Sequence, residues 1–291
     1  MAANPKHHIL PHNVEGNFFV DERCIDCGTC YAHAPGIFGS AATHAYVTQQ
    51  PAVESDRRRA LEALHACPVH AIGQTVRDNL TAEVLDAFPI RLNDNIYFCG
   101  FASEHTYGAA SYLIQRDEGN ILVDVPRFFS RLVRNIERLG GISRIFLTHR
   151  DDIAGHEDWA RHFGCRRIMH TLDHPPSTIE MIIEGENQLY LADDLIAIPT
   201  PGHTRGSMCL LHKQTLFSGD HLAGTQPGQQ AELLSFRDAC WYSWAEVKRS
   251  NQRLLDYDFS RVLPGHGYRF EAAGADAARA ALRRLIGRMD S

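Results

Sequence analysis

The chain has 291 residues, 44% of them hydrophobic, and a formal net charge of −6. Its acidic balance and scattered Lys and Arg residues argue against a nucleic-acid partner. No apolar run approaches the roughly 18 to 20 residues that span a membrane, and residues 1–13 lack a secretory h-region. We therefore expect a globular cytoplasmic protein without a membrane partner, with an organelle stroma as the alternative location.

The first part of the chain shows little apolar periodicity but is rich in cysteine. Residues 1–13 are polar and aperiodic, which favours a flexible arm. Residues 14–75 contain short strand-like segments, a helix over about 54–65 and four cysteines. A core of this size is marginal by itself, so a metal centre is expected to hold the segment together. Residues 74–90 are interpreted as a connector that ends at Pro89.

The rest of the chain, residues 90–291, alternates strands with helices. A helix is predicted over 128–139, where Leu132, Ile136 and Leu139 follow i, i+4, i+7 spacing. Further helices are predicted over 244–256 and at the C-terminus, where Leu282 and Leu285 share one face. The predicted strands lie in residues 95–101, 109–115, 120–125, 144–148, 195–204, 207–212, 215–220 and 261–267. The fold class is α+β.

Four cysteines form a ligand-like set rather than a disulfide framework. Cys24, Cys27 and Cys30 follow C-x2-C-x2-C spacing, and Cys67 precedes Pro68. Three thiolates on a tight loop that Gly28 allows to curl, with a distant fourth, suit the corners of an iron–sulfur cubane. Zinc also accepts four thiolates, but its structural sites usually pair two cysteine knuckles, so we favour iron–sulfur over zinc or inert thiols. The other cysteines are interpreted as small buried residues.

This segment resembles bacterial-type ferredoxins. Two-cluster members carry a further cysteine and a proline four positions after the third cysteine, where this chain has Ala34 and Pro35. Because that ligand is missing and Cys27 is present, the resemblance implies one 4Fe-4S cluster in a ferredoxin-like domain. His33, His65 and His70 lie near the cluster ligands in sequence. We interpret them as solvated polar residues, with tuning of the cluster potential as the alternative.

A second set of metal ligands is predicted at the ends of strands. Four loops that each follow an apolar strand carry His149, His203, Asp220 and His266. Imidazole and carboxylate groups at neighbouring strand ends can meet around one or two metal ions. Any one of these histidines would be unremarkable, but the ordered set beside glycines and turns indicates a site.

Residues 90 to 270 resemble the metallo-β-lactamase-fold superfamily, most specifically in "TPGHTRGS" and "SGD". The resemblance implies a four-layer αββα sandwich with a metal site at one edge. It assigns metal ligands to His149, His203, Asp220 and His266, with Asp220 as the bridging carboxylate. Asp124 corresponds to the structural aspartate of the superfamily.

The segment "HRDDIAGH" departs from the HxHxDH motif of two-metal hydrolases. One alignment puts Asp151 where the second histidine belongs. The other assumes a two-residue deletion and puts Asp151 at the aspartate and Asp152 at the last histidine. Both replace nitrogen donors by carboxylates, which favours iron or manganese, although zinc also accepts carboxylates. Asp151 and Asp152 are therefore candidate metal ligands and candidate catalytic residues.

Several residues near this site have more than one possible role. His156 is interpreted as part of a helix that starts near Asp152, with a role as a metal ligand as the alternative; Asp152 is the cap of that helix or a metal ligand. His170 and His221 are weaker candidate ligands. Arg150 and Arg205 are expected to pair with the extra carboxylates rather than to bind an anionic substrate. Trp241 and Trp244 are assigned to the core, with a pocket wall as the alternative.

Three functions are compatible with these motifs. The favoured one is an oxidoreductase in which the cluster exchanges electrons with a mono- or dinuclear metal site, acting on a small-molecule substrate with an electron-transfer partner protein. The alternative is a metal-dependent hydrolase of an ester, thioester or amide with a structural or regulatory cluster. The third is a non-enzymatic iron–sulfur sensor. The oxidoreductase is favoured because hydrolysis moves no electrons and leaves the cluster without a chemical role.

Overall fold

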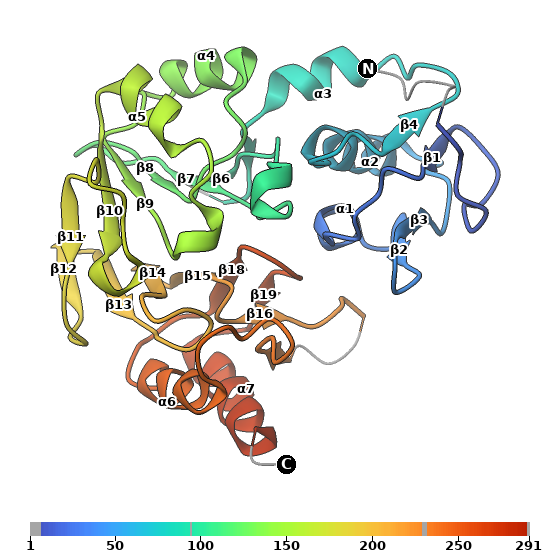
Figure 1. The fold of residues 1–291 in the computed structure, drawn as a ribbon. Helices are drawn as coiled ribbons and strands as arrows, with labels where there is room; N and C mark the ends of the chain where they lie inside the picture. The colour runs from blue at the N-terminus through green and yellow to red at the C-terminus, as the bar shows by residue number, and fades with distance from the viewer. Residues whose placement is uncertain (1–6, 94, 229–231, 290–291) are drawn as a thin grey trace. The chain divides into compact units, whose positions relative to one another are not determined.

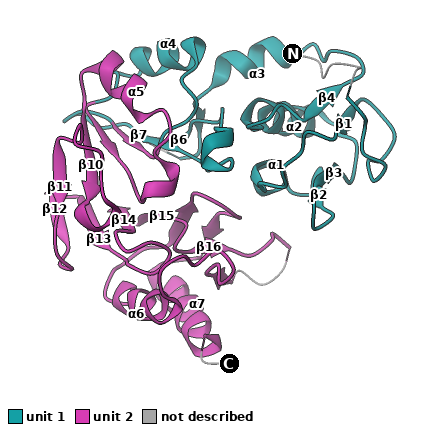
Figure 2. Ribbon diagram, in the orientation of Figure 1, with its two compact units in different colours: residues 1–120, 125–142 teal, residues 121–124, 143–291 magenta. Residues whose placement is uncertain are grey.

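The computed structural model describes residues 7–93, 95–228 and 232–289. Figure 1 shows the fold of the chain, which forms the two compact units coloured in Figure 2. Unit 1 comprises residues 1–120 and 125–142, and unit 2 comprises residues 121–124 and 143–291. The cysteine-rich segment thus lies in the same unit as the strands between residues 90 and 114. The expected domain limits, 14–75 and 90–291, stay a prediction.

Unit 1 contains short strands and four α-helices within its described residues. Its elements are β1 (Phe18–Val20), α1 (Thr29–His33), β2 (Phe38–Ser40), β3 (Ala45–Val47), α2 (Glu54–Ala66), β4 (Ile72–Gln74), α3 (Thr81–Ala87), β5 (Ile90–Arg91), β6 (Ile96–Phe98), β7 (Tyr112–Ile114) and α4 (Ser130–Arg138). Strands β1 and β4 pair antiparallel, as do β2 and β3. Strands β5, β6 and β7 form an antiparallel run.

Helix α2 occupies the predicted position. Glu54 and Asp56 lie in its first turn, where carboxylates are favourable at the positive end of the helix dipole. Ala60, Leu61 and Leu64 are buried on its inner face. The helix ends against Cys67, which is its C-cap, so the distant cysteine is held by regular structure.

Two predictions for unit 1 are wrong. The connector at 74–90 contains α3, a seven-residue helix that buries Val84. The described part of the arm, residues 7–13, is bound to its neighbours: Ile9 bridges Asp21, and the Asn13 side chain donates to Leu10 and Val20 carbonyls. Residues 1–6 lie outside the described part of the chain.

Unit 2 is a sandwich of two sheets between helices (Figure 1). Its elements are β8 (Ile121–Val123), β9 (Arg144–Phe146), α5 (His156–Phe163), β10 (Arg166–His170), β11 (Met181–Ile183), β12 (Leu189–Ala192), β13 (Leu195–Pro199), β14 (Met208–His212), β15 (Thr215–Gly219), β16 (Ala223–Gly224), β17 (Leu233–Leu234), α6 (Trp244–Leu254), β18 (Arg261–Pro264), β19 (Phe270–Glu271) and α7 (Ala275–Arg288). Strands β11, β10, β9 and β8 are adjacent and parallel. The second sheet has the order β12-β13-β14-β15-β18-β19.

Helices cover the outer faces of this sandwich. Helix α5 lies beside the first sheet, and α6 and α7 lie beside the second (Figure 1). Leu254 of α6 and Leu282 and Leu285 of α7 pack in one buried cluster with strand residues such as Leu216 and Val262. The predicted αββα layering is therefore confirmed, with apolar strand residues on the inner faces and the amphipathic helices outside.

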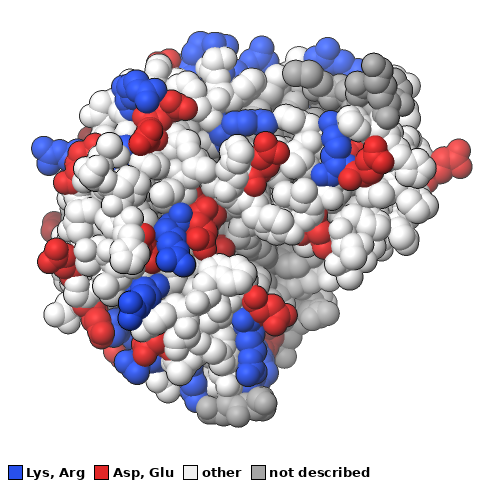
Figure 3. All heavy atoms as spheres, in the orientation of Figure 1, with Lys and Arg blue, Asp and Glu red and all other residues white. Residues whose placement is uncertain are grey.

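The charge distribution on the surface and the lengths of the helices bear on the expected partners. Blue and red groups are interspersed on the face drawn in Figure 3 rather than gathered into a stripe of one sign. No helix among the described residues is long and apolar enough to cross a membrane.

Candidate metal centres

The four predicted cluster cysteines line one pocket in unit 1. Its walls also contain apolar side chains, among them Val20, Ile25 and Ala45. The cysteine loop leads into α1, whose N-cap is Gly28 with φ +85°. A left-handed backbone at this point favours glycine and turns the chain around the pocket. Cys67 reaches the same pocket from the end of α2.

The surroundings of these sulfur atoms suit a cluster. Backbone N–H groups of Asp26 and Ala45 donate to Cys24 Sγ at 3.4 and 3.2 Å, and that of Ala71 donates to Cys67 Sγ at 3.3 Å. Burial raises the pKa of the Cys27 thiol to about 11, and burial also raises the pKa of Cys30 and Cys67. Amide donors and bound iron both stabilise thiolates that burial alone disfavours. The cysteine set therefore fits a 4Fe-4S cluster.

The three histidines near the cluster ligands are not simply solvated. His33 Nε2 lies 2.7 Å from Glu62, and its ring stacks on Phe98. His65 is buried, with its ring centroid 6.2 Å from those of Phe88 and Phe101. His70 Nε2 contacts Arg127 at 2.7 Å. The solvated interpretation is wrong for His65, because α2 turns that residue into the core, and for His33, whose side chain is 6% exposed.

The second predicted ligand set converges at strand ends in unit 2. His149 follows β9, His203 lies between β13 and β14, Asp220 follows β15 and His266 follows β18. Asp151 and Asp152 belong to a short 3-10 helix, Arg150–Asp152. Two overlapping groups are close enough to hold a metal ion: His149 with Asp151 and His203, and His149 with Asp152 and Asp220.

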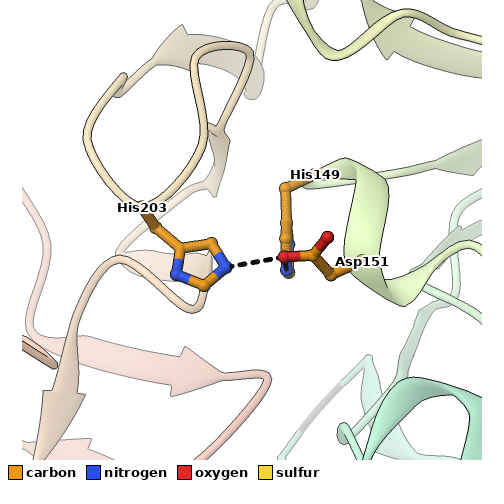
Figure 4. Close-up of side chains that lie close together, drawn as sticks. All are labelled: His149, Asp151 and His203. Carbon is orange, nitrogen blue, oxygen red and sulfur yellow. Dashed lines mark hydrogen bonds and ion pairs between the residues drawn. The ribbon is translucent and has the colours of Figure 1, made fainter. Parts of the chain in front are cut away.

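Figure 4 shows how the first group is arranged. His203 points toward Asp151, with 3.2 Å between Nε2 and Oδ2, and His149 lies behind that carboxylate. His149 Nε2 is 4.0 Å from Asp151, 3.8 Å from Asp152 and 3.7 Å from Asp220. His203 Nε2 and His266 Nε2 are 3.8 and 3.9 Å from Asp220 Oδ2. Asp220 therefore lies among three imidazoles.

The proton on His149 can be placed from its neighbours. Thr148 Oγ1 donates to Asp124, so the Thr148 oxygen is the acceptor for Nδ1–H of His149 at 3.0 Å. The Nε2 atom then carries a lone pair directed at the carboxylates. Nδ1–H of His203 donates to the Ala239 carbonyl at 2.6 Å, which directs its Nε2 at Asp151. His149 is therefore in the tautomer in which Nε2 binds a metal, and His203 presents its Nε2 to the same carboxylate.

The Nε2 lone pair of His149 repels the carboxylates that it faces unless a cation lies between them. His149 Nε2, Asp152 Oδ2 and Asp220 Oδ1 are buried without a hydrogen-bond partner among the described residues. Leaving such groups unpaired costs about 1–3 kcal/mol each. Burial lowers the pKa of His149 to about 4, and burial, with the Asp220 carboxylate nearby, raises the pKa of Asp152. A divalent cation would satisfy all three groups at once, so the donor set fits a metal ion.

Other residues hold the loops that carry His149 and His203, and the sequence motifs do not reveal all of them. Buried Asp173 accepts from the backbone N–H of Arg150, from Thr204 Oγ1 and from the N–H of Gly206. It thereby joins the His149 loop to the His203 loop. A single aspartate after a strand gives no recognisable motif, so only the fold reveals its role. Thr148 links His149 to Asp124 and likewise stands in no recognisable motif.

Asp124 supports the site in the position that the resemblance implies. It has φ +50°, is buried, and accepts from the backbone N–H of Thr148 at 2.8 Å. Asp124→Ala should lower the free energy of unfolding by roughly 1–3 kcal/mol. It should also weaken non-cluster metal binding by about 10–100-fold, because His149 loses its support. Denaturant melts and a metal-chelator competition measure the two effects.

Asp124→Asn is the matched control for this prediction. Asparagine tolerates the left-handed backbone and keeps an acceptor oxygen for Thr148. It should therefore retain most of the stability and metal affinity. Equal losses in both variants would contradict the proposed role of that hydrogen bond.

The structure shows the positions and contacts of two neighbouring histidines, His156 and His170. His156 begins α5 and contacts Arg167, as the helix interpretation expected, but the N-cap of α5 is Gly155 and not Asp152. The helix starts later than predicted because residues 150–152 form their own 3-10 turn. His170 uses both ring nitrogens, toward Gly185 O and Leu172 N.

The remaining side chains around the site match the sequence-based expectations only in part. Arg150 pairs with Asp151 at 3.7 Å, as expected, but Arg205 lies over the Tyr242 ring instead of pairing with a site carboxylate. Trp241 is 61% exposed, so its assignment to the core is wrong. His221 is buried and is not part of either metal-binding group of described residues.

Comparisons with known proteins agree with this architecture. The family described as the 4Fe-4S single cluster domain of Ferredoxin I matches residues 20–74. A lactamase-like protein of Pestalotiopsis microspora is 24% identical over 169 residues, which cover 55% of this chain and 49% of that protein. A hydroxyacylglutathione hydrolase of Citrobacter koseri is 28% identical over 120 residues, covering 38% and 46%. The chain thus spans about half the length of these curated relatives.

A solved structure shows the same fold as the sandwich. The DIM-1 metallo-β-lactamase superposes with a TM-score of 0.51 at 15% identity, over 69% of this chain and 95% of that protein. The chain therefore combines a single-cluster ferredoxin segment with a metallo-β-lactamase fold. Both resemblances drawn from the sequence are confirmed.

Proposed function

We propose that this protein is an iron–sulfur oxidoreductase in which a 4Fe-4S cluster exchanges electrons with iron bound in the sandwich. The observation that carries the proposal is the number of carboxylates around His149: oxygen atoms of Asp151, Asp152 and Asp220 lie within 4.0 Å of its Nε2. Carboxylates are harder donors than imidazoles and suit iron or manganese better than a nitrogen-rich set does. Their negative charge also favours the more highly charged, oxidised state of a redox metal.

In this proposal the metal-site residues, Asp151 and the four cysteines have different roles. His149, His203, His266, Asp152 and Asp220 would hold one or two metal ions, and such an ion would supply one-electron chemistry together with a binding point for a small substrate. Asp151 is the carboxylate that a substrate can reach, because its side chain is 40% exposed whereas that of Asp152 is 3% exposed. Cys24, Cys27, Cys30 and Cys67 hold the cluster, which exchanges electrons with a partner protein.

A hydrolase is the second candidate, supported by the similarity to the Citrobacter koseri hydroxyacylglutathione hydrolase. In such an enzyme the metal lowers the pKa of its bound water to about 7. The same full-length chain, loaded separately with iron and with zinc, can be tested on hydroxyacylglutathione. We expect no thioester cleavage above that of the free metal. Cleavage by the zinc-loaded chain that persists when the cluster is oxidised or reduced would favour the hydrolase.

A further inference from the structure

The loop between β6 and β7 lies against the cluster-binding loop within unit 1. Tyr107 Oη donates to the Ile25 carbonyl at 2.6 Å, between the first two cluster cysteines in sequence. Thr29 Oγ1 donates to the Gly108 carbonyl at 2.7 Å. Two hydrogen bonds thus hold residues 107–108 to the Cys24–Cys30 loop, although about 80 residues separate the partners in sequence.

Gly108 is packed directly on a cluster ligand. Its φ is +84°, and a Cβ built there would lie 2.8 Å from both Cβ and Sγ of Cys27. Thr29 Oγ1 is also 3.4 Å from that sulfur. Because an added Cβ would overlap Cys27, there is no room for a water molecule between Gly108 and Cys27 on that side. Tyr107 precedes it with φ +49°, a conformation that is uncommon for a residue with a side chain and needs support from its surroundings.

We propose that Tyr107 and Gly108 are part of the cluster site: they position Cys27 and close its side of the cluster to water and dioxygen. The proposal assigns a role to residues outside the matched ferredoxin segment, 20–74. It does not depend on whether the sandwich performs redox or hydrolytic chemistry, because both candidate functions include the cluster.

The packing against Cys27 limits the exposure of the cluster to solvent, and this exposure affects the reduction potential. A reduced cluster with four thiolate ligands carries one more negative charge than the oxidised cluster, and water stabilises the more highly charged form. Opening the Cys27 side should therefore raise the reduction potential. It should also speed the oxidative loss of the cluster, because small molecules reach the sulfur and iron atoms more readily.

The test uses the full chain, reconstituted anaerobically, as wild type and as three variants. Gly108→Ala places a methyl group against Cys27. Gly36→Ala is its matched control, because Gly36 has φ +85° and no atom within 4 Å of the added Cβ. Tyr107→Phe removes only the hydrogen bond to Ile25. The midpoint potential comes from EPR-monitored redox titration, and the cluster lifetime in air from the decay of visible absorbance.

We expect Gly108→Ala and Tyr107→Phe to raise the potential and to shorten the cluster lifetime severalfold relative to Gly36→Ala. If Gly108→Ala does not take up a cluster, Tyr107→Phe decides by the same two measurements. The proposal is overturned if Gly36→Ala changes both quantities as much as Gly108→Ala does, or if Tyr107→Phe has the potential and lifetime of the wild type.

Discussion

Replacing His149 by alanine should remove the non-cluster metal while the iron–sulfur cluster stays in place. His149 is shared by both groups that can hold a metal ion, and its Nε2 faces three carboxylates. Loss of an outer partner of a metal ligand typically weakens binding by about 10–100-fold, so loss of the central ligand should weaken it by about 100-fold or more. Metal content after dialysis against a weak chelator, measured by elemental analysis, tests this.

His156→Gln is the control for the His149 variant. His156 is a buried histidine that follows the His149 loop and begins α5, and its Nδ1 contacts Arg167. This variant should therefore keep the non-cluster metal even if it loses some stability. Metal loss of the same size in both variants would mean that general disturbance of the loop, rather than a ligand, explains the effect.

Replacing Cys67 by serine should abolish the cluster. Cys67 is buried at the end of α2 and reaches the pocket that the Cys24–Cys30 loop also lines. Serine is a poor ligand for iron, so the cluster content after anaerobic reconstitution should fall by about tenfold or more. The segment from β1 to β4 should also become sensitive to protease, because its small core loses the centre that joins the loop to α2.

Cys240→Ser supplies the comparison for that experiment. Cys240 lies in unit 2, is partly exposed, and contacts the Gly202 carbonyl through its sulfur. Visible absorbance and EPR of this variant should match those of the wild type. A Cys67→Ser protein that keeps a full cluster would show that another group completes the site.

Much of this architecture could be predicted because its signals are local. The spacing of Cys24, Cys27 and Cys30, the apolar periodicity of α2 and α7, and the glycines beside His203 and His266 each occupy a few consecutive residues. The glycine next to His266 has a clear reason: a Cβ on Gly265 would lie 2.8 Å from Asp220 Oδ1. Such a requirement leaves a motif that can be read from the sequence.

The failures concern contacts between residues that are distant in sequence. The described arm is held by Asn13, whose side chain bonds to backbone atoms as far away as Val47. Asp173 joins two ligand loops, and His65 becomes buried only because α2 packs beside Phe88 and Phe101. Helix α3 is a short segment without strong amphipathic periodicity, so its stability depends on tertiary packing. No local pattern encodes these features.

The central claim is that the carboxylate-rich site binds iron that exchanges electrons with the cluster. Anaerobic purification, followed by metal analysis and by EPR before and after stepwise reduction, tests it most directly. We predict about four cluster irons per chain, additional non-cluster iron, and reduction of that iron in the wild type but much more slowly in the Cys67→Ser variant. A chain that holds zinc in stoichiometric amount beside the cluster irons, with no further iron signal, would contradict the account.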